Sequence, residues 1–160
     1  MSEQPKDTTP IHKTVTVPVA PPRAFELFTV GIGDWWPLAT YSIGDDQAAG
    51  VVFGEGPGGS IVESLADGTT SAWGTVTNWE PPHRVAFTWH PGTPVTEATS
   101  VEVTFTPGEQ GHTVVELVHS GWDRRPDGSA ARAGYETGWN PVIKHYARFV
   151  VISGLPARAR

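Results

Sequence analysis

The feature that most constrains this chain is a change of hydrophobic period near residue 129. The segment 130–153, AARAGYETGWNPVIKHYARFVVIS, spaces its apolar side chains as an amphipathic helix does. On a helical projection one stripe holds Tyr135, Trp139, Val142, Tyr146, Phe149 and Val150. Asn140, Lys144 and Arg148 fall on the opposite side. Such a long terminal helix needs an apolar surface to cover its stripe.

The segments before residue 129 predict that surface. They are short, alternate apolar and polar residues, and are separated by turn sequences such as ADG and PGEQG. The apolar positions that share strand faces are Ile11, Val15, Val17 and Val19; Val85, Phe87 and Trp89; Val101, Val103 and Phe105; and Val115, Leu117 and His119. Consecutive hairpins of this kind form an antiparallel sheet with one buried face. Lys13 is an exception on its apolar face, and we expect Trp73, more than Trp79, to point inward.

Two short features complete the predicted architecture. APPRAFELFT, after the first strand, predicts a short helix that buries Phe25 and Phe28. Pro141 removes a hydrogen bond from the terminal helix, so we expect a kink or a second helix start there. The predicted fold class is α+β: a curved antiparallel sheet of about six or seven strands around a long C-terminal helix.

Composition sets limits on function. The chain has 160 residues, no cysteine and a net charge of −6, with 11 scattered basic residues. We expect a single domain over residues 11–153 between tails at 1–10 and 154–160. We expect no nucleic-acid partner, no membrane span and no cofactor, and a cytoplasmic monomer or homodimer. Cysteine ligands are excluded, and the histidines lack the close pairing of a helical zinc site, so no metal is predicted.

The stretch GDWWPLATYSIG places two tryptophans side by side on a short irregular segment. Adjacent residues of an extended segment point apart, so we expect Trp35 in the core and Trp36 in a lid over a pocket, with Tyr41 nearby. Both indoles in a filled core remain the alternative.

The order of these motifs resembles a known family. WWP, then VESLADG, WGTVTNWEPPHRVAFTW, VELVHSGW and a long amphipathic helix are similar to the SRPBCC or START-like superfamily. Within it, the resemblance is to the branch named after the activator of Hsp90 ATPase, and it covers about residues 11–152. The resemblance implies a helix-grip fold with a cavity between sheet and terminal helix, which in the superfamily holds apolar molecules.

We therefore expect a small apolar ligand as partner, in a cavity between sheet and helix. The candidate ligand-binding residues are Trp36, Tyr41, Trp73, Phe87, Trp89, Val103, Leu117, His119, Trp122, Tyr135, Trp139 and Val142. His119 is either a hydrogen-bonded structural residue or a general base. Trp122 is either a pocket rim or a helix-packing residue.

Two other functions remain open. A cyclase or hydrolase would use His119 with a tyrosine such as Tyr135, and a chaperone-partner module would need an exposed apolar patch. The nucleophile pattern Gly-x-Ser-x-Gly is absent, and no catalytic residue is assigned. Glu63, Asp67, Glu80 and Arg84 either form a buried ion pair beneath the sheet or lie exposed near turns.

Overall fold

The computed structural model describes residues 7–38, 44 and 47–153. The strands are β1 (Ile11–Val17), β2 (Ala48–Phe53), β3 (Ser60–Leu65), β4 (Thr70–Glu80), β5 (Arg84–Trp89), β6 (Thr99–Pro107) and β7 (Thr113–Ser120). The helices are α1 (Pro21–Phe28), α2 (Ile32–Trp35) and α3 (Gly128–Ser153), with single 3₁₀ turns at η2 (Val95–Glu97), η3 (Glu109–Gly111) and η4 (Trp122–Arg124).

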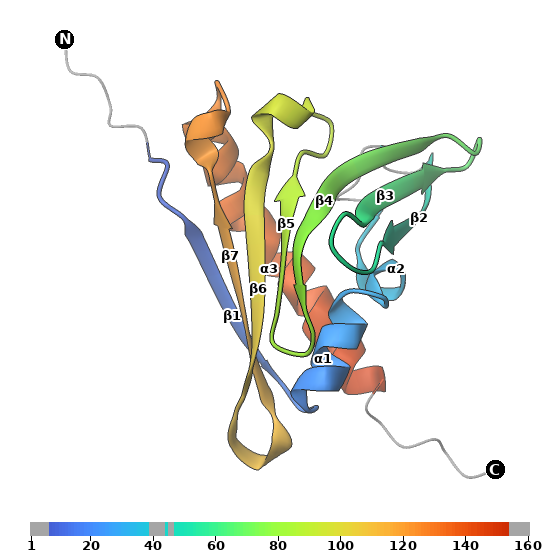
Figure 1. Ribbon diagram of the computed structural model, residues 1–160, viewed down its shortest axis with the longest axis vertical. Helices are drawn as coiled ribbons and strands as arrows, with labels where there is room; N and C mark the ends of the chain where they lie inside the picture. Colours follow the sequence, from blue (N-terminus) through green and yellow to red (C-terminus); the bar gives the residue numbers. More distant parts are fainter. Residues whose placement is uncertain (1–6, 39–43, 45–46, 154–160) are drawn as a thin grey trace.

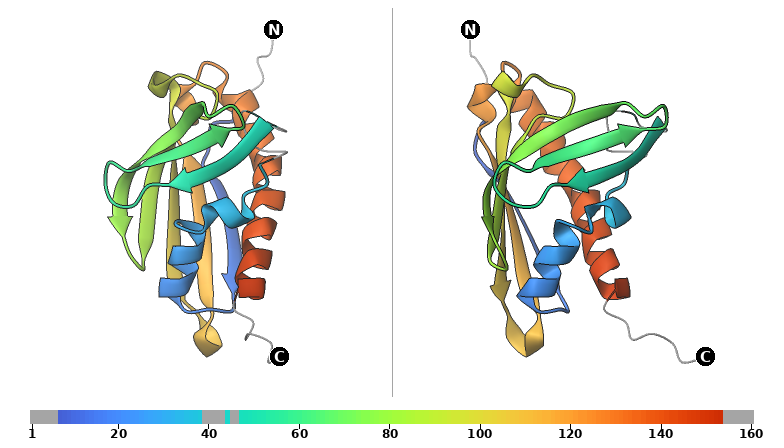
Figure 2. Two further views of the ribbon diagram at one scale, coloured as in Figure 1. Left: turned by 90° about the vertical axis from the view of Figure 1, so that its right-hand side faces the viewer. Right: turned by 45° about the vertical axis from the view of Figure 1, so that its right-hand side comes forward.

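The described strands form one seven-stranded antiparallel sheet in the order β1-β7-β6-β5-β4-β3-β2. Figure 1 shows α3 crossing behind this sheet, and Figure 2 shows β2, β3 and β4 curling forward so that the sheet bends around the helix. The short helices α1 and α2 follow β1 and lie on the same side of the sheet as α3. The predicted α+β helix-grip fold and its short helices after the first strand are confirmed.

The inner face of the sheet follows the predicted alternation. On β6 and β7 every second residue is buried, from Thr99 to Phe105 and from Thr113 to His119. On β1 the exception, Lys13, also turns inward, and its Nζ lies 3.4 Å from a carboxylate oxygen of Glu136 on α3. An ion pair with the helix therefore lets a lysine occupy an apolar face.

Strand β4 departs from simple alternation. Its pairing register shifts against both β3 and β5, which is the signature of β-bulges. Trp73 is fully buried as expected, but Trp79 also turns inward, where its ring centroid lies 5.0 Å from that of Phe25. A Cβ atom at Gly74 would collide with the carbonyl oxygen of Thr88, so only glycine permits this close approach of β4 and β5.

Helix α3 buries the predicted stripe against the sheet. Trp139, Val142, Tyr146 and Val150 are buried, Tyr135 and Phe149 are half-buried, and the opposite residues Asn140, Lys144 and Arg148 are exposed. The helix continues through Pro141, so the expected second start there is wrong. Trp139 and Val142 pack on the core on both sides of the proline, and this packing offsets the lost hydrogen bond.

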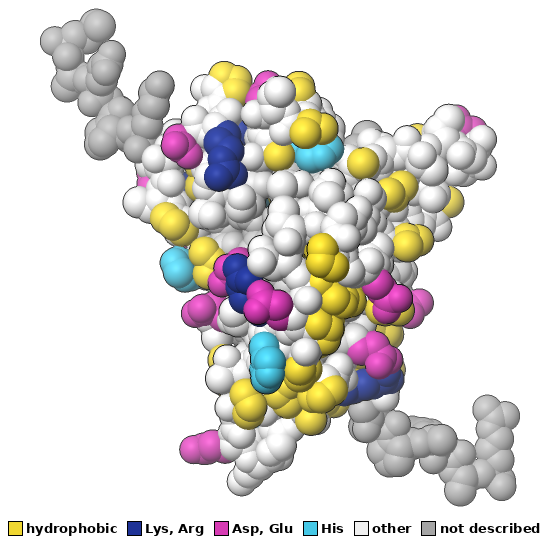
Figure 3. Space-filling model, viewed as in Figure 1, with side chains coloured by type: hydrophobic (Ala, Val, Ile, Leu, Met, Phe, Trp, Pro, Cys, Tyr) yellow, Lys and Arg dark blue, Asp and Glu magenta, His cyan; other side chains and the backbone are white. Residues whose placement is uncertain are grey.

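The outer face of the sheet carries acidic, basic and apolar side chains intermixed, as Figure 3 shows. Of the helices in the described part of the chain, none has both the length and the apolar character needed to cross a bilayer. Near the N-terminus, the carboxylate of Asp7 lies 3.3 Å from the guanidinium of Arg132 on α3, and Arg132 also donates to the carbonyl of Thr9. Residues 7–9 of the expected N-terminal tail thus contact the helix.

Candidate functional site

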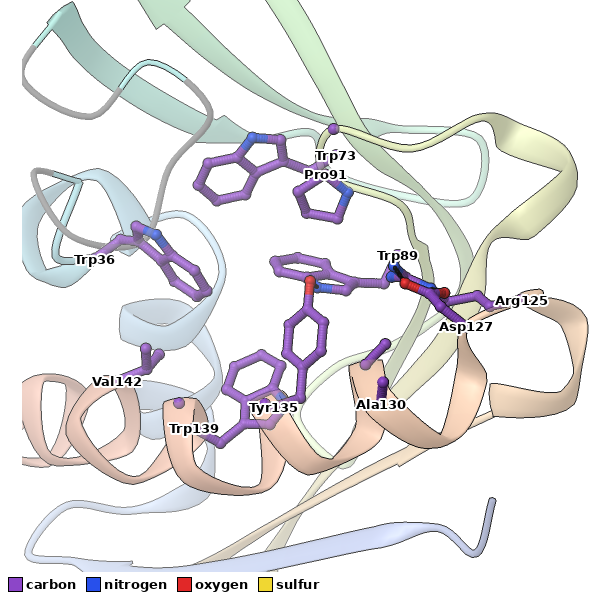
Figure 4. A pocket seen from close by; sticks show the side chains of 14 residues that line it. Trp36, Trp73, Trp89, Pro91, Arg125, Asp127, Ala130, Tyr135, Trp139 and Val142 are labelled. Atoms are coloured by element: carbon purple, nitrogen blue, oxygen red, sulfur yellow. Dashed lines mark hydrogen bonds and ion pairs between the residues drawn. The ribbon is translucent and has the colours of Figure 1, made fainter. Parts of the chain in front are cut away.

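A cavity of about 610 Å³ lies between the bent part of the sheet and the N-terminal half of α3. Figure 4 shows aromatic side chains from the sheet and from α3 facing one another across it. The cavity is lined by Trp36, Trp73, Trp89, Pro91, Gly92, Arg125, Asp127, Ala130, Ala131, Gly134, Tyr135, Gly138, Trp139 and Val142. Its volume falls within the usual range of small-molecule sites, roughly 300 to 1,000 Å³.

Trp36 closes one side of this cavity. It follows α2 directly, and its backbone N–H still donates to the carbonyl of Ile32, while its own backbone is already extended. Its ring centroid lies 5.1 Å from that of Trp73, 5.7 Å from that of Trp89 and 6.0 Å from that of Trp139. Trp36 therefore joins the sheet wall to the helix wall, at the position predicted for a lid.

Trp35 touches Trp36 but makes its other contacts away from the cavity. Its side chain packs against Phe28 and Tyr146, and its indole N–H donates to the carbonyl of Leu27 at 2.9 Å. Trp35 does not line the cavity. The expected extended segment is wrong here, because Trp35 is the last residue of α2, and the ring centroids of the two indoles lie 5.7 Å apart. Both indoles are buried in the core cluster, and they differ in that Trp36 lines the cavity and Trp35 does not.

The indole N–H groups of the remaining tryptophan walls bond to the protein. Trp73 donates to the buried carboxylate of Glu63 at 2.9 Å, and Trp89 donates to the hydroxyl oxygen of Tyr135 at 3.1 Å. Trp139 donates to Nδ1 of His119 at 3.0 Å. These three bonds fix the ring orientations and leave ring faces and edges toward the cavity.

His119 supports the wall from behind. Thr99 donates its hydroxyl hydrogen to the carbonyl of Trp89, so its oxygen accepts from Nε2 of His119 at 2.6 Å. With Nδ1 accepting from Trp139, the imidazole is the neutral Nε2–H tautomer with both nitrogens bonded. Burial, with a smaller effect of the Arg125 charge, lowers the pKa of His119 to about 3. His119 is therefore a structural residue, and the general-base interpretation lacks a free nitrogen.

Trp122 lies beneath His119, with ring centroids 4.1 Å apart, and is fully buried. Its indole N–H donates to the carbonyl of His119 at 3.1 Å, and its ring packs on Tyr135 of α3 at 5.5 Å. Of the two interpretations left open by the sequence, the structure places it as a helix-packing residue and not at the rim.

The helix side of the cavity is formed by small residues between large ones. Ala131, Gly134 and Gly138 alternate with Tyr135, Trp139 and Val142 along the face of α3 that lines the cavity. A Cβ atom at Gly134 would meet no atom within 4 Å. The lack of side chains at Gly134 and Gly138, and the single methyl group of Ala131, contribute the open volume.

Arg125 and Asp127 line the cavity from the segment that leads into α3. Nε of Arg125 donates to one carboxylate oxygen of Asp127 at 2.8 Å, and a terminal nitrogen donates to the other at 3.0 Å. Only 12% of the Arg125 side chain is exposed. A half-exposed carboxylate and a largely buried guanidinium are thus the charged groups of the lining.

The predicted site residues divide into three groups. Those that line the cavity are Trp36, Trp73, Trp89, Tyr135, Trp139 and Val142. Those that are buried outside its lining are Phe87, Val103, Leu117, His119 and Trp122. Tyr41 lies outside the described residues.

The residues that the sequence prediction missed are the small and charged ones. Ala131, Gly134 and Gly138 lie on the apolar stripe at helical spacing, so a helical projection places them toward the sheet. They were not predicted because the projection was based on large apolar side chains. For Arg125 and Asp127, the Arg-Pro-Asp sequence gives no indication that both side chains reach the cavity.

The charged side chains of Glu63, Asp67, Glu80 and Arg84 lie in three different environments. Glu63 is fully buried and accepts hydrogen bonds from Trp73 and from the backbone N–H of Gly44 at 2.8 Å. Asp67 is exposed and bonds to Thr69 within its turn. Arg84 pairs with Glu80 and Glu102 near the surface, so these charges do not combine into one buried ion pair. In the described ranges, no group of three or more acidic or histidine side chains is arranged to hold a metal ion.

Several solved structures resemble this chain over most of its length. An anthrahydroquino-gamma-pyrone synthase, Txn09, complexed with SUM, is 30% identical, with 91% of this chain and 99% of that chain covered and a TM-score of 0.61. Protein MLL2253 from Mesorhizobium loti is 19% identical, with 92% and 100% covered and a TM-score of 0.65. An AHSA1-like protein from Aeromonas hydrophila is 18% identical, with 94% and 99% covered and a TM-score of 0.61.

A search of curated proteins found no match. The family model described as activator of Hsp90 ATPase homolog 1-like protein matches residues 19–150, from the turn after β1 to within the last turns of α3. That span includes every residue of the cavity lining. The chain therefore belongs to the family of activator of Hsp90 ATPase homolog 1-like proteins, within the SRPBCC superfamily.

Proposed function

We propose that this protein binds a planar, apolar small molecule in the cavity between the bent sheet and α3. The observation that carries the proposal is a space of about 610 Å³ whose walls are four tryptophans, one tyrosine and small helix residues. A cavity of this size bounded by ring faces exposes apolar area that a ligand would remove from water.

The shape of the walls favours a flat molecule. Trp36 and Trp89 both contact Trp139, at centroid distances of 6.0 and 5.8 Å, so rings surround the space from sheet and helix. The N–H groups of Trp73, Trp89 and Trp139 already bond to protein atoms, so these walls offer few donors. Ring faces with satisfied N–H groups suit stacking or edge-to-face contact with an aromatic ligand.

The comparisons support a ligand in this fold. The 30% identical structure is named as a synthase and is complexed with SUM, and superfamily members commonly hold hydrophobic ligands. We infer binding instead of catalysis for this chain because His119, the expected general base, has both nitrogens engaged. Asp127, the carboxylate of the lining, is paired with Arg125.

The exposed large apolar side chains of the described residues are dispersed. They lie on the turn after α1, on β2, on η2 and at the end of α3: Val30, Val52, Val95, Val151 and Ile152. A chaperone-partner surface would need a contiguous apolar patch, so this distribution gives that alternative no specific support.

The proposal is tested with N-phenyl-1-naphthylamine, a neutral aromatic probe whose fluorescence rises in apolar surroundings. We expect saturable binding to the wild-type protein, and Trp36→Ala should weaken it on the order of tenfold because it removes one wall. Trp79→Ala is the matched control, since Trp79 faces the same core from β4 but does not line the cavity. Melting temperatures of both variants separate binding from stability.

Two results would contradict the proposal. One is the absence of saturable binding by the wild-type protein. The other is an equal loss of probe affinity in Trp36→Ala and Trp79→Ala, because a general loosening of the core would then explain both. Native mass spectrometry of the purified protein would additionally detect an apolar molecule carried over from the host.

A further inference from the structure

The aromatic cavity has polar hydrogen-bond donors at one end, and they are not used up by the protein. Figure 4 shows the Tyr135 hydroxyl and the Arg125 and Asp127 side chains on the side of the cavity where Trp89 lies. All four residues line the same space. The donors that remain free there determine what kind of polar group a ligand can carry.

Tyr135 is the first donor. Its oxygen accepts the indole N–H of Trp89 at 3.1 Å, and its own hydrogen has no acceptor among the described residues. Burial raises the pKa of Tyr135, while the hydrogen bond from Trp89 and the charge of Arg125 oppose the rise, so the phenol stays protonated at neutral pH. Accepting from Trp89 also polarises the O–H group, which strengthens it as a donor.

Arg125 is the second donor. Asp127 takes Nε–H and one hydrogen of a terminal nitrogen, which leaves the Nη1 group without a partner in the described part of the chain. Its hydrogen bond to Asp127 raises the pKa of Arg125, with smaller contributions from nearby charges that include Glu97, so the guanidinium is charged. The pairing with Asp127 also holds the guanidinium in one orientation.

The free O–H of Tyr135 and the free Nη1 group of Arg125 both require an acceptor, such as an electron-rich oxygen. We propose that the ligand is a planar aromatic acid, whose rings lie among the tryptophans and whose anionic oxygens accept from Tyr135 O–H and the free edge of Arg125. This inference rests on the proposed function and adds the chemical class of the ligand. A carboxylate or phenolate satisfies both donors, whereas a neutral hydrocarbon leaves a buried O–H group unpaired.

A matched pair of probes tests the inference: anthracene-2-carboxylate and the neutral ketone 2-acetylanthracene, with binding followed by energy transfer from tryptophan. We expect the wild-type protein to prefer the acid about tenfold, as for one hydrogen bond to a charged group. Arg125→Gln should abolish that preference, because the affinity for the charged acid should fall more than the affinity for the neutral ketone. Tyr135→Phe should weaken both probes, since both offer an acceptor oxygen.

Two further variants keep the test decisive. Arg124→Gln removes the same charge from the neighbouring position, whose guanidinium instead bonds to Ser100, and should retain the preference. Asp127→Asn releases more of Arg125 and should increase the preference for the acid, which gives an opposite change should Arg125→Gln fold poorly.

Equal affinity of the wild-type protein for the two probes, or a preference that persists in Arg125→Gln, would overturn the inference while leaving the binding proposal intact. Equal loss of the preference in Arg124→Gln would also overturn it, because long-range charge would then be the cause. If neither probe bound the wild-type protein, the proposed function and the inference would fail together.

Discussion

The two ends of the space between sheet and α3 are both aromatic, yet one is filled and the other is hollow. At the filled end, rings interlock at centroid distances of 5.1 to 5.9 Å: Phe25, Phe28, Trp35, Phe105 and Tyr146. At the hollow end, tryptophans at similar distances from one another surround about 610 Å³: Trp36, Trp73, Trp89 and Trp139. Aromatic content alone therefore does not decide whether a core is solid.

The difference has two structural causes. At the filled end, α1 inserts between sheet and helix, because Phe28 contacts Phe105 on β6 and Tyr146 on α3. At the hollow end, α3 presents Gly134 and Gly138 in place of large side chains. The cavity therefore exists because α1 packs between sheet and α3 only at the filled end, and because α3 carries glycines at the hollow end.

The filled end should show the largest stability effect. Trp35→Ala removes a buried ring and its hydrogen bond to the Leu27 carbonyl, so we expect a loss of about 3 to 5 kcal/mol in the free energy of unfolding. Trp36→Ala should lose less, since its ring already borders open space. Urea unfolding of both variants measures the difference.

Lys144→Ala on the exposed face of α3 is the control and should change stability by less than about 0.5 kcal/mol. Equal losses in Trp35→Ala and Trp36→Ala would remove the distinction between the two ends, since both indoles would then be packed alike.

The hollow end should respond more strongly to pH, because its wall is supported by a neutral buried histidine. The folded-state pKa of His119 is lowered to about 3, below its unfolded value of about 6.5, so the unfolded chain binds the extra proton between these values. The contribution of His119 to the free energy of unfolding is fully present above about pH 6.5. Between pH 6.5 and the folded-state pKa it is lost by about 1.4 kcal/mol for each unit that the pH falls.

His119→Gln isolates that contribution. The variant should be less stable at pH 7.5, because it disturbs the bonds to Trp139 and Thr99, but its stability should fall less steeply between pH 6.5 and 4.5. Urea unfolding at several pH values gives both slopes, and identical slopes would show that His119 is not held neutral.

The filled end and the strand framework were largely predictable from the sequence. The period of α3 identified Trp139, Val142 and Tyr146 as buried, and the alternation along β6 and β7 identified the inward residues of those strands. These are local properties, set by the rise and twist of a single element.

The extent of the hollow end was not predictable in the same way. Phe87 and Trp89 share a strand face, but only Trp89 reaches the cavity, while Phe87 packs on Phe53 of β2. Which inward residue meets open space depends on the bulges of β4 and on where α1 inserts, and both are long-range features. The same holds for Arg125, whose direction is set by Asp127.

A small gain in stability should accompany a large loss of binding at Gly134, one of the glycines that the sequence prediction missed. Gly134→Leu places a side chain where a Cβ atom meets nothing within 4 Å, so it should enter the cavity without a backbone clash. Replacing a mid-helix glycine should raise stability by about 0.5 to 1 kcal/mol, while filled volume should weaken N-phenyl-1-naphthylamine binding severalfold. Gly134→Ala should give the same stability gain with a smaller binding loss, and Ala133→Leu, on the exposed face of α3, should leave binding unchanged. A Gly134→Leu variant that is destabilised and still binds the probe would mean that the hollow end closes around this position, and the contrast between the two ends would no longer hold.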